Sequence, residues 1–230
     1  MTQTSQSEPI VVWLRDDLRL DDNPALAEAA DSGRPVVPLV VLDEESDGVR
    51  TLGGAHKWWL HHSLERFGKD LADKGAPLIL RRGKAREHVV DIVESTGATT
   101  LLMNRRYDQA SRAVDDAVEA ALGGDVEVQR FTANILHDPD KVRTKTGGWY
   151  KVYTPFWKNL AEREPRDPID PPDKLAALDD QPRSDRLEDW DLLPTRPDWS
   201  GGIAAFWEVG EAAAHERFEE FCDEWLDDST

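Results

Sequence analysis

The chain has 230 residues, of which 39% are hydrophobic and nine are Trp, so it can bury one large domain or one domain with an appendage. Its 28 basic and 46 acidic residues give a formal charge of −18, which argues against nucleic-acid binding by its average surface, because phosphates would be repelled. A single cysteine, Cys222, excludes a disulfide framework within one chain and any CxxC site. The N-terminus is polar and no run of about 18 apolar residues occurs, so we expect a cytoplasmic protein with no membrane partner.

Short apolar, β-branched runs recur along the first 131 residues and predict strands. They are Ile10–Leu14, Val36–Leu42, Pro77–Leu80, Thr99–Met103 and Val126–Phe131. The first, second and fourth runs are nearly continuous hydrophobics, which is typical of strands that are buried on both faces.

Helical patterns separate these runs. Asn23 is a capping residue directly before Pro24, and it predicts a helix over Pro24–Ala30. The second predicted helix carries Leu60, Leu64, Phe67 and Leu71 on one face and stops near Gly75. Two further helices are predicted over Arg86–Glu94 and Gln109–Leu122. Strands that alternate with helices predict an α/β fold, with a doubly wound five-stranded parallel sheet of the Rossmann-like kind.

The composition changes after Leu160. Seven of the 14 prolines lie in residues 165–200, which predicts a long connector without a core of its own. A helical pattern then returns over Ile203–Leu226, with Phe218, Phe221 and Trp225 among its apolar positions. We expect one C-terminal helix that is poorly anchored, because a connector of this composition offers it little to pack against.

The stretch WLRDDLRLDDNPAL, Trp13–Leu26, turns from an apolar strand into alternating Arg and Asp. Ligands of open α/β sheets bind at the carboxyl ends of the strands, so these charges lie where such a crevice opens. Arg15 and Arg19 could form ion pairs with the neighbouring Asp residues, or they could meet an anionic ligand. No GxGxxG or GxxxxGK[ST] sequence follows any strand, which argues against ordinary nicotinamide and P-loop sites.

VVWLRDDLRLDDNPAL closely resembles the N-terminal signature of the DNA photolyase/cryptochrome family. Three later stretches resemble the same family in the same order: GGAHKWWLHHSLERF, MNRRYDQ and TKTGGWYKVYTPFWK. The tail WEVGEAAAHERFEEF is similar to the helix that opens the family's second domain, so the resemblance runs from about residue 10 to the end.

The resemblance implies the N-terminal light-harvesting domain of a deoxyribodipyrimidine photolyase, a carbon–carbon lyase that repairs pyrimidine dimers in light. The family's FAD and DNA pocket belong to a C-terminal helical domain with a T-S-x-L-S-P-Y-L-x-x-G stretch, which this chain lacks. We therefore expect FAD and damaged DNA only through a missing domain, and an inactive chain on its own. A cryptochrome-like blue-light sensor and a stand-alone α/β ligand-binding domain are the alternatives.

The resemblance also implies a division into three parts. Residues 10–135 correspond to the antenna-binding α/β domain, and residues 136–200 to an aromatic segment and Pro-rich connector. Residues 201–230 correspond to the first helix of the absent flavin-binding domain. The family's α/β domain carries an antenna chromophore of the folate, deazaflavin or flavin type, and we expect one here.

Candidate residues for that chromophore come from three places. Asn104, Arg105 and Arg106 follow the fourth strand, where an amide suits a ring edge and a guanidinium suits an acidic tail, with structural ion pairs as the alternative. A Trp ring near the start of the second helix could stack on the chromophore, although at least one of Trp58 and Trp59 is expected in the core. The cofactor-binding residues predicted are Arg15, Asp16, His56, Trp58, Asn104, Arg105 and Arg106.

Other residue types are expected to have structural roles. His61 and His62 point about 100° apart on a helix and have no acidic ligand motif, so they predict no metal site. Tyr107 and Asp108 are expected to cap the following helix, and no catalytic arrangement stands out. Asn104 lies at a strand end rather than in the core, so Asn104→Ala is expected to weaken chromophore binding before it affects folding.

Overall fold

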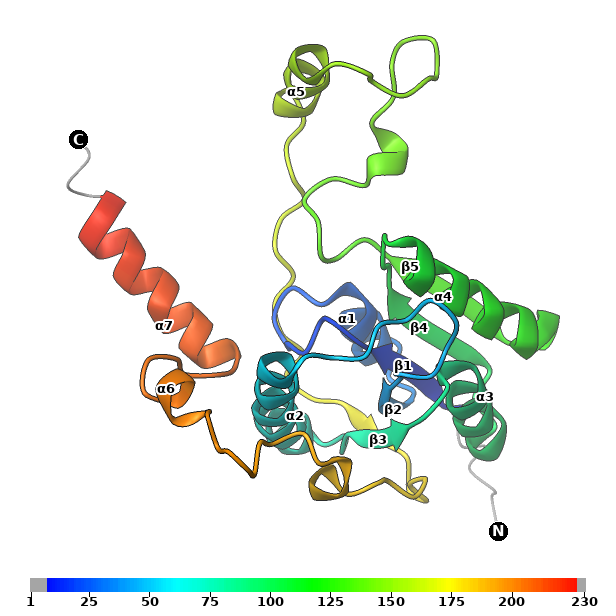
Figure 1. Ribbon diagram of the computed structural model, residues 1–230. Coiled ribbons are helices and arrows are strands. Elements are labelled where there is room, and N and C mark those ends of the chain that lie inside the picture. Colours follow the sequence, from blue (N-terminus) through cyan, green and yellow to red (C-terminus); the bar gives the residue numbers. More distant parts are fainter. Residues whose placement is uncertain (1–7, 227–230) are drawn as a thin grey trace.

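The computed structural model describes the backbone of residues 8–226 and the side chains of residues 8–224. A twisted parallel sheet lies at its centre, with helices on both faces (Figure 1). The strand order is β3-β2-β1-β4-β5, which confirms the predicted α/β fold with a doubly wound sheet. The five strands are β1 (Ile10–Leu14), β2 (Pro35–Leu42), β3 (Ile79–Arg82), β4 (Thr100–Asn104) and β5 (Glu127–Phe131).

The two faces of β1 belong to two separate hydrophobic cores. Ile10, Val12 and Leu14 pack in the core that contains α1 (Pro24–Asp31) and α2 (Gly54–Lys74). Val11 and Trp13 face the opposite core.

That opposite core contains α3 (Ala85–Thr96) and α4 (Gln109–Leu122). Burial on both faces explains why β1 is apolar throughout. The chain runs from β1 to β2 and β3 on one side and returns to β4 on the other, so strand order reverses between β1 and β4. Ligands of such sheets bind outside the carboxyl ends of the strands at this point.

The third strand lies two residues later than the sequence predicted. Pairing with β2 begins at Ile79 and ends at Arg82, whereas the apolar run suggested Pro77–Leu80. Because β3 is at the edge of the sheet, it can end in two arginines that interrupt the apolar pattern.

The connector after residue 160 is packed against the domain at several points. Leu175, Trp190 and Leu192 are buried in the core of α1 and α2, and β6 (Ala176–Ala177) pairs with the start of β2. Before the connector, α5 (Tyr153–Ala161) stands away from the sheet (Figure 1), a helix that the sequence pattern did not predict. The connector therefore completes the core of the α/β domain and has no large core of its own.

The prediction of a single C-terminal helix over Ile203–Leu226 is wrong. The chain forms a short α6 (Gly201–Ala204), then α7 (Glu211–Phe221), followed by a π-helical turn over Cys222–Leu226. Gly210 separates the two helices at φ 112° and ψ 167°, a backbone conformation that ends any helix and that only glycine adopts readily. Trp225, part of the predicted apolar face, lies outside the described side chains. Within the described part of the chain, no helix is long and apolar enough to cross a membrane.

Candidate functional site

The loop between β1 and α1 is fixed by a buried hydrogen-bond cluster at the ends of β1 and β4. Asp17 accepts hydrogen bonds from the Arg15 backbone N–H at 2.6 Å and from Asn104 Nδ2 at 2.7 Å. Asn104 Nδ2 also donates to Asn23 Oδ1 at 2.8 Å, and that same oxygen caps α1 at Leu26. Asn104 is 1% exposed, so the expectation that it stands outside the core is wrong.

Two arginines share one buried carboxylate next to this cluster. Asp115 of α4 accepts from Arg106 Nη2 at 2.7 Å and from Arg15 Nη1 at 3.3 Å, and it is 2% exposed. The Arg15 guanidinium also donates to the Asn104 carbonyl oxygen. Both guanidiniums lie over the ring of Trp13, at 4.2 Å and 5.6 Å from its centroid.

Burial lowers the pKa of the Arg15 guanidinium to about 10, against the opposing effect of Asp115. Asp115 accepts hydrogen bonds from both guanidiniums, and the neighbouring Asp17 and Asp16 carboxylates add further negative charge near Arg15. Trp13 Nε1 and Arg106 Nε are buried donors without a hydrogen-bond partner among the described residues. The cluster thus offers unused hydrogen-bond donors at the carboxyl ends of β1 and β4.

A cavity of 520 Å³, which we call the strand-end cavity, opens beside this cluster at the carboxyl ends of β1 and β2. Its volume is in the range of small-molecule sites. Four of the seven predicted site residues line it: Arg15, Asp16, His56 and Arg106. The other lining residues include Trp13, the end of β2, residues 48–50, Leu52 and the start of α4.

Two acidic residues that line this cavity, Asp43 and Asp108, accept hydrogen bonds from backbone N–H groups. Partial burial raises the pKa of Asp43, but hydrogen bonds from Ser46, Ala85 and Glu45 outweigh it and hold the pKa below its ordinary value. Asp108 caps α4 by accepting from the Ser111 N–H at 2.9 Å, which confirms its predicted capping role. Hydrogen bonding from the Ser111 side chain, and then from its backbone N–H, lowers the pKa of Asp108.

The three remaining site residues have structural partners. Asn104 belongs to the buried cluster, and Arg105 Nη1 lies 3.7 Å from an oxygen of Asp138. Trp58 is 5% exposed, with its ring 4.6 Å from that of His62. None of the three is among the residues that line the strand-end cavity. Their contact with a ligand stays a prediction.

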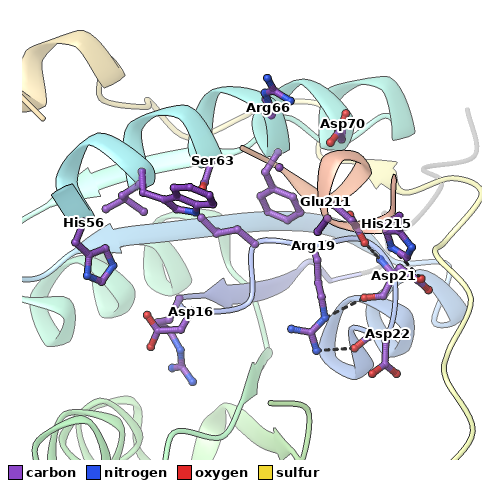
Figure 2. Close-up of a pocket in the computed structure, with 17 residues that line it drawn as sticks. Asp16, Arg19, Asp21, Asp22, His56, Ser63, Arg66, Asp70, Glu211 and His215 are labelled. Carbon is purple, nitrogen blue, oxygen red and sulfur yellow. Dashed lines mark hydrogen bonds and ion pairs between the residues drawn. The ribbon is translucent and has the colours of Figure 1, made fainter. Parts of the chain in front are cut away.

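A second cavity, of 580 Å³, lies between α2, the loop after β1 and the start of α7 (Figure 2). It shares Arg15, Asp16, His56 and Leu60 with the strand-end cavity. Trp59, the more exposed of the tryptophan pair at 38%, lines this second cavity.

Comparison with known proteins identifies the family. The sequence profile of the DNA photolyase family matches residues 10–174. A deoxyribodipyrimidine photo-lyase of Agrobacterium fabrum is 43% identical over 95% of this chain and 45% of its own length. The chain belongs to the DNA photolyase family. The crystal structure of an archaeal photolyase from Sulfolobus tokodaii, which contains two FAD molecules, superposes with a TM-score of 0.66 at 18% identity and covers 78% of this chain and 40% of that one.

Other members and their structures agree with this placement. Cryptochrome-1 of Arabidopsis thaliana is 34% identical over 74% of this photolyase-family chain and 25% of its own length. The crystal structure of a bacterial class III photolyase from Agrobacterium tumefaciens superposes with a TM-score of 0.89 at 40% identity, and the match covers 97% of this chain and 46% of that one. The chain thus spans less than half the length of these relatives, and it corresponds to the family's N-terminal domain.

Proposed function

We propose that this chain is the light-harvesting half of a photolyase, and that its strand-end cavity binds an antenna chromophore of the folate, deazaflavin or flavin type. The observation that carries the proposal is a pair of buried donors, Trp13 Nε1 and Arg106 Nε, which have no hydrogen-bond partner among the described residues and belong to side chains that line the cavity. A chromophore with an acidic tail or an electron-rich ring edge would supply the missing acceptor.

The residues present fit such a group. The cavity volume admits a flat ring system, and the Arg106 guanidinium, whose Nε is one of the two unpartnered donors, lines it together with Trp13. His56 and Leu60 line the cavity from the other side and can contact a ring. When bound, the chromophore would absorb light and pass its excitation to a flavin.

That flavin, and damaged DNA with it, would belong to a second domain of the whole protein. The similarity to the Agrobacterium photo-lyase, which is about twice as long as this chain, supports this division. We propose residues 10–135 as the antenna-binding domain, 136–200 as the connector and 201–230 as the start of the flavin-binding domain. Repair of pyrimidine dimers would be an activity of the whole protein, in the cytoplasm.

Fluorescence titration of the full chain with a folate, a deazaflavin and a flavin chromophore tests the proposal. Arg106→Gln removes one charge-assisted hydrogen-bond donor, worth about 1.5–3 kcal/mol, and should weaken binding roughly ten- to a hundredfold. Arg130→Gln is the matched control, because Arg130 pairs with Asp116 and Glu119 and does not line the cavity. Binding of none of the three, or equal affinity of Arg106→Gln and wild type, would refute the assignment.

A further inference from the structure

Three potential metal ligands meet where α7 contacts the loop after β1. One ligand atom from each of Asp21, Glu211 and His215 lies within 4.8 Å of the other two. Figure 2 shows the three side chains together at one end of the second cavity. We propose that these residues bind a divalent transition-metal ion, which clasps α7 to the α/β domain.

The backbone already arranges the ligands for this purpose. Glu211 and His215 are four residues apart on α7, so they lie on the same face of the helix. Asp21 Oδ2 is 3.6 Å from His215 Nε2. Nitrogen and oxygen ligands of a tetrahedral zinc ion lie roughly 3.3–3.5 Å apart when their bonds are about 2.0–2.2 Å long. The pair is therefore close to metal-binding spacing.

The Glu211 carboxylate is held in place by the loop it faces. Its two oxygens accept hydrogen bonds from the backbone N–H groups of Leu20 at 2.8 Å and Asp21 at 2.7 Å. Each carboxylate oxygen keeps a further lone pair for a metal. Outer hydrogen bonds that orient a ligating carboxylate are a regular part of metal sites in proteins.

The charge and the ligand types favour a transition metal. Two carboxylates and a neutral imidazole carry a charge of about −2, which a divalent cation neutralises. Among the described residues, no arginine or lysine forms an ion pair with the Asp21 carboxylate, whose ion-pairing contact is with His215. An imidazole with two carboxylates suits zinc, cobalt or nickel better than magnesium or calcium, which prefer oxygen ligands throughout. The second cavity leaves room for water as the remaining ligand.

A second cluster, His61, His62 and Glu65, has ligand atoms equally near one another but fits an ion less well. All three residues come from α2, and they include a single carboxylate, so the cluster carries less negative charge. The two imidazole rings are nearly perpendicular, with centroids 5.3 Å apart.

The site at Asp21 joins residues about 190 positions apart in sequence, so it exists only while α7 is docked. Metal binding would therefore stabilise the docked position of α7 by mass action.

Titration of the metal-free full chain with Co²⁺, followed by its visible absorption and by competition with Zn²⁺, tests the proposal. We expect one equivalent to bind, and His215→Ala and Asp21→Asn each to weaken binding by at least about tenfold. His215 is 57% exposed, so its replacement should leave the fold intact, as circular dichroism would check. His137→Ala is the control histidine and should bind like the wild type.

Amide exchange gives a second readout. Zn²⁺ should slow exchange at the start of α7 in the wild type and not in His215→Ala. Absence of Co²⁺ binding at about 100 µM metal, or unchanged binding by either His215→Ala or Asp21→Asn, overturns the proposal. Loss of the ion in His62→Ala also overturns it, because the ion would then belong to α2.

Discussion

Asp115 accepts hydrogen bonds from two largely buried arginines, so its removal is a sharp test of the cluster. The side chains of Arg15 and Arg106 are 6% and 17% exposed, and that of Asp115 is 2% exposed. Asp115→Asn keeps the size of the side chain and removes its charge. Breaking a buried ion pair by removing one partner costs about 3–5 kcal/mol of folding free energy.

Removing the Asp115 charge leaves the Arg15 guanidinium, which is 6% exposed, without its charged hydrogen-bond partner. We therefore expect Asp115→Asn to lower the free energy of unfolding by about 3–5 kcal/mol, and Tm by on the order of 10 °C for a chain of this length.

Thermal and urea unfolding measure this difference. Asp116→Asn is the matched control, because Asp116 is the next residue, is 67% exposed and pairs with Arg130 at the surface. Exposed ion pairs are worth less than about 1 kcal/mol, so the control should unfold close to the wild type. An Asp115→Asn protein within about 1 kcal/mol of the wild type would refute the view that the cluster depends on this charge.

Three further results are expected. Asp43→Asn should lower the free energy of unfolding by about 1 kcal/mol at pH 7, because it weakens the hydrogen bond from the Ala85 N–H. Because the folded-state pKa of Asp43 is lowered, the wild type should lose this advantage over the variant in urea unfolding as the pH falls below about 4. Gly210→Ala should speed amide exchange at the start of α7, because alanine is strained at φ 112° and its Cβ would lie 2.8 Å from Arg66 Cδ. Gly202→Ala is the control: its Cβ would meet no atom within 4 Å, so amide exchange should be unchanged. The chain alone should purify without stoichiometric FAD and should not repair dimers in light; stoichiometric FAD together with repair would contradict the division of labour proposed above.

The sheet could be predicted from the sequence because burial on both faces forces long apolar runs. β1, β2 and β4 follow from such runs within one residue at each end. The break before α7 could not be predicted, because the helical pattern continues across it. The break coincides with Gly210, at φ 112°, and with Val209, which is 3% exposed, and sequence periodicity gives no sign of that burial.

The strand-end cavity was predicted in part. The rule that ligands bind at strand ends placed Arg15, Asp16 and Arg106 together, and all three line the cavity. Trp13 and Asp115 were missed, because a tryptophan inside a strand and an acid inside a helix have ordinary structural explanations. Asp115 lies three residues before the buried Val118, so the helical period of α4 did carry a signal for its inward position.

The indole N–H resonance of Trp13 in a ¹⁵N-labelled chain tests the proposed site most directly. Trp13 lines the strand-end cavity, and its buried Nε1 has no hydrogen-bond partner in the described part of the chain, whereas Trp149 is exposed and serves as the internal control. Saturation with a chromophore that binds should shift the Trp13 signal and leave that of Trp149 in place. A saturated chain in which the signal of Trp59 moves and that of Trp13 does not would put the chromophore in the second cavity and contradict the account.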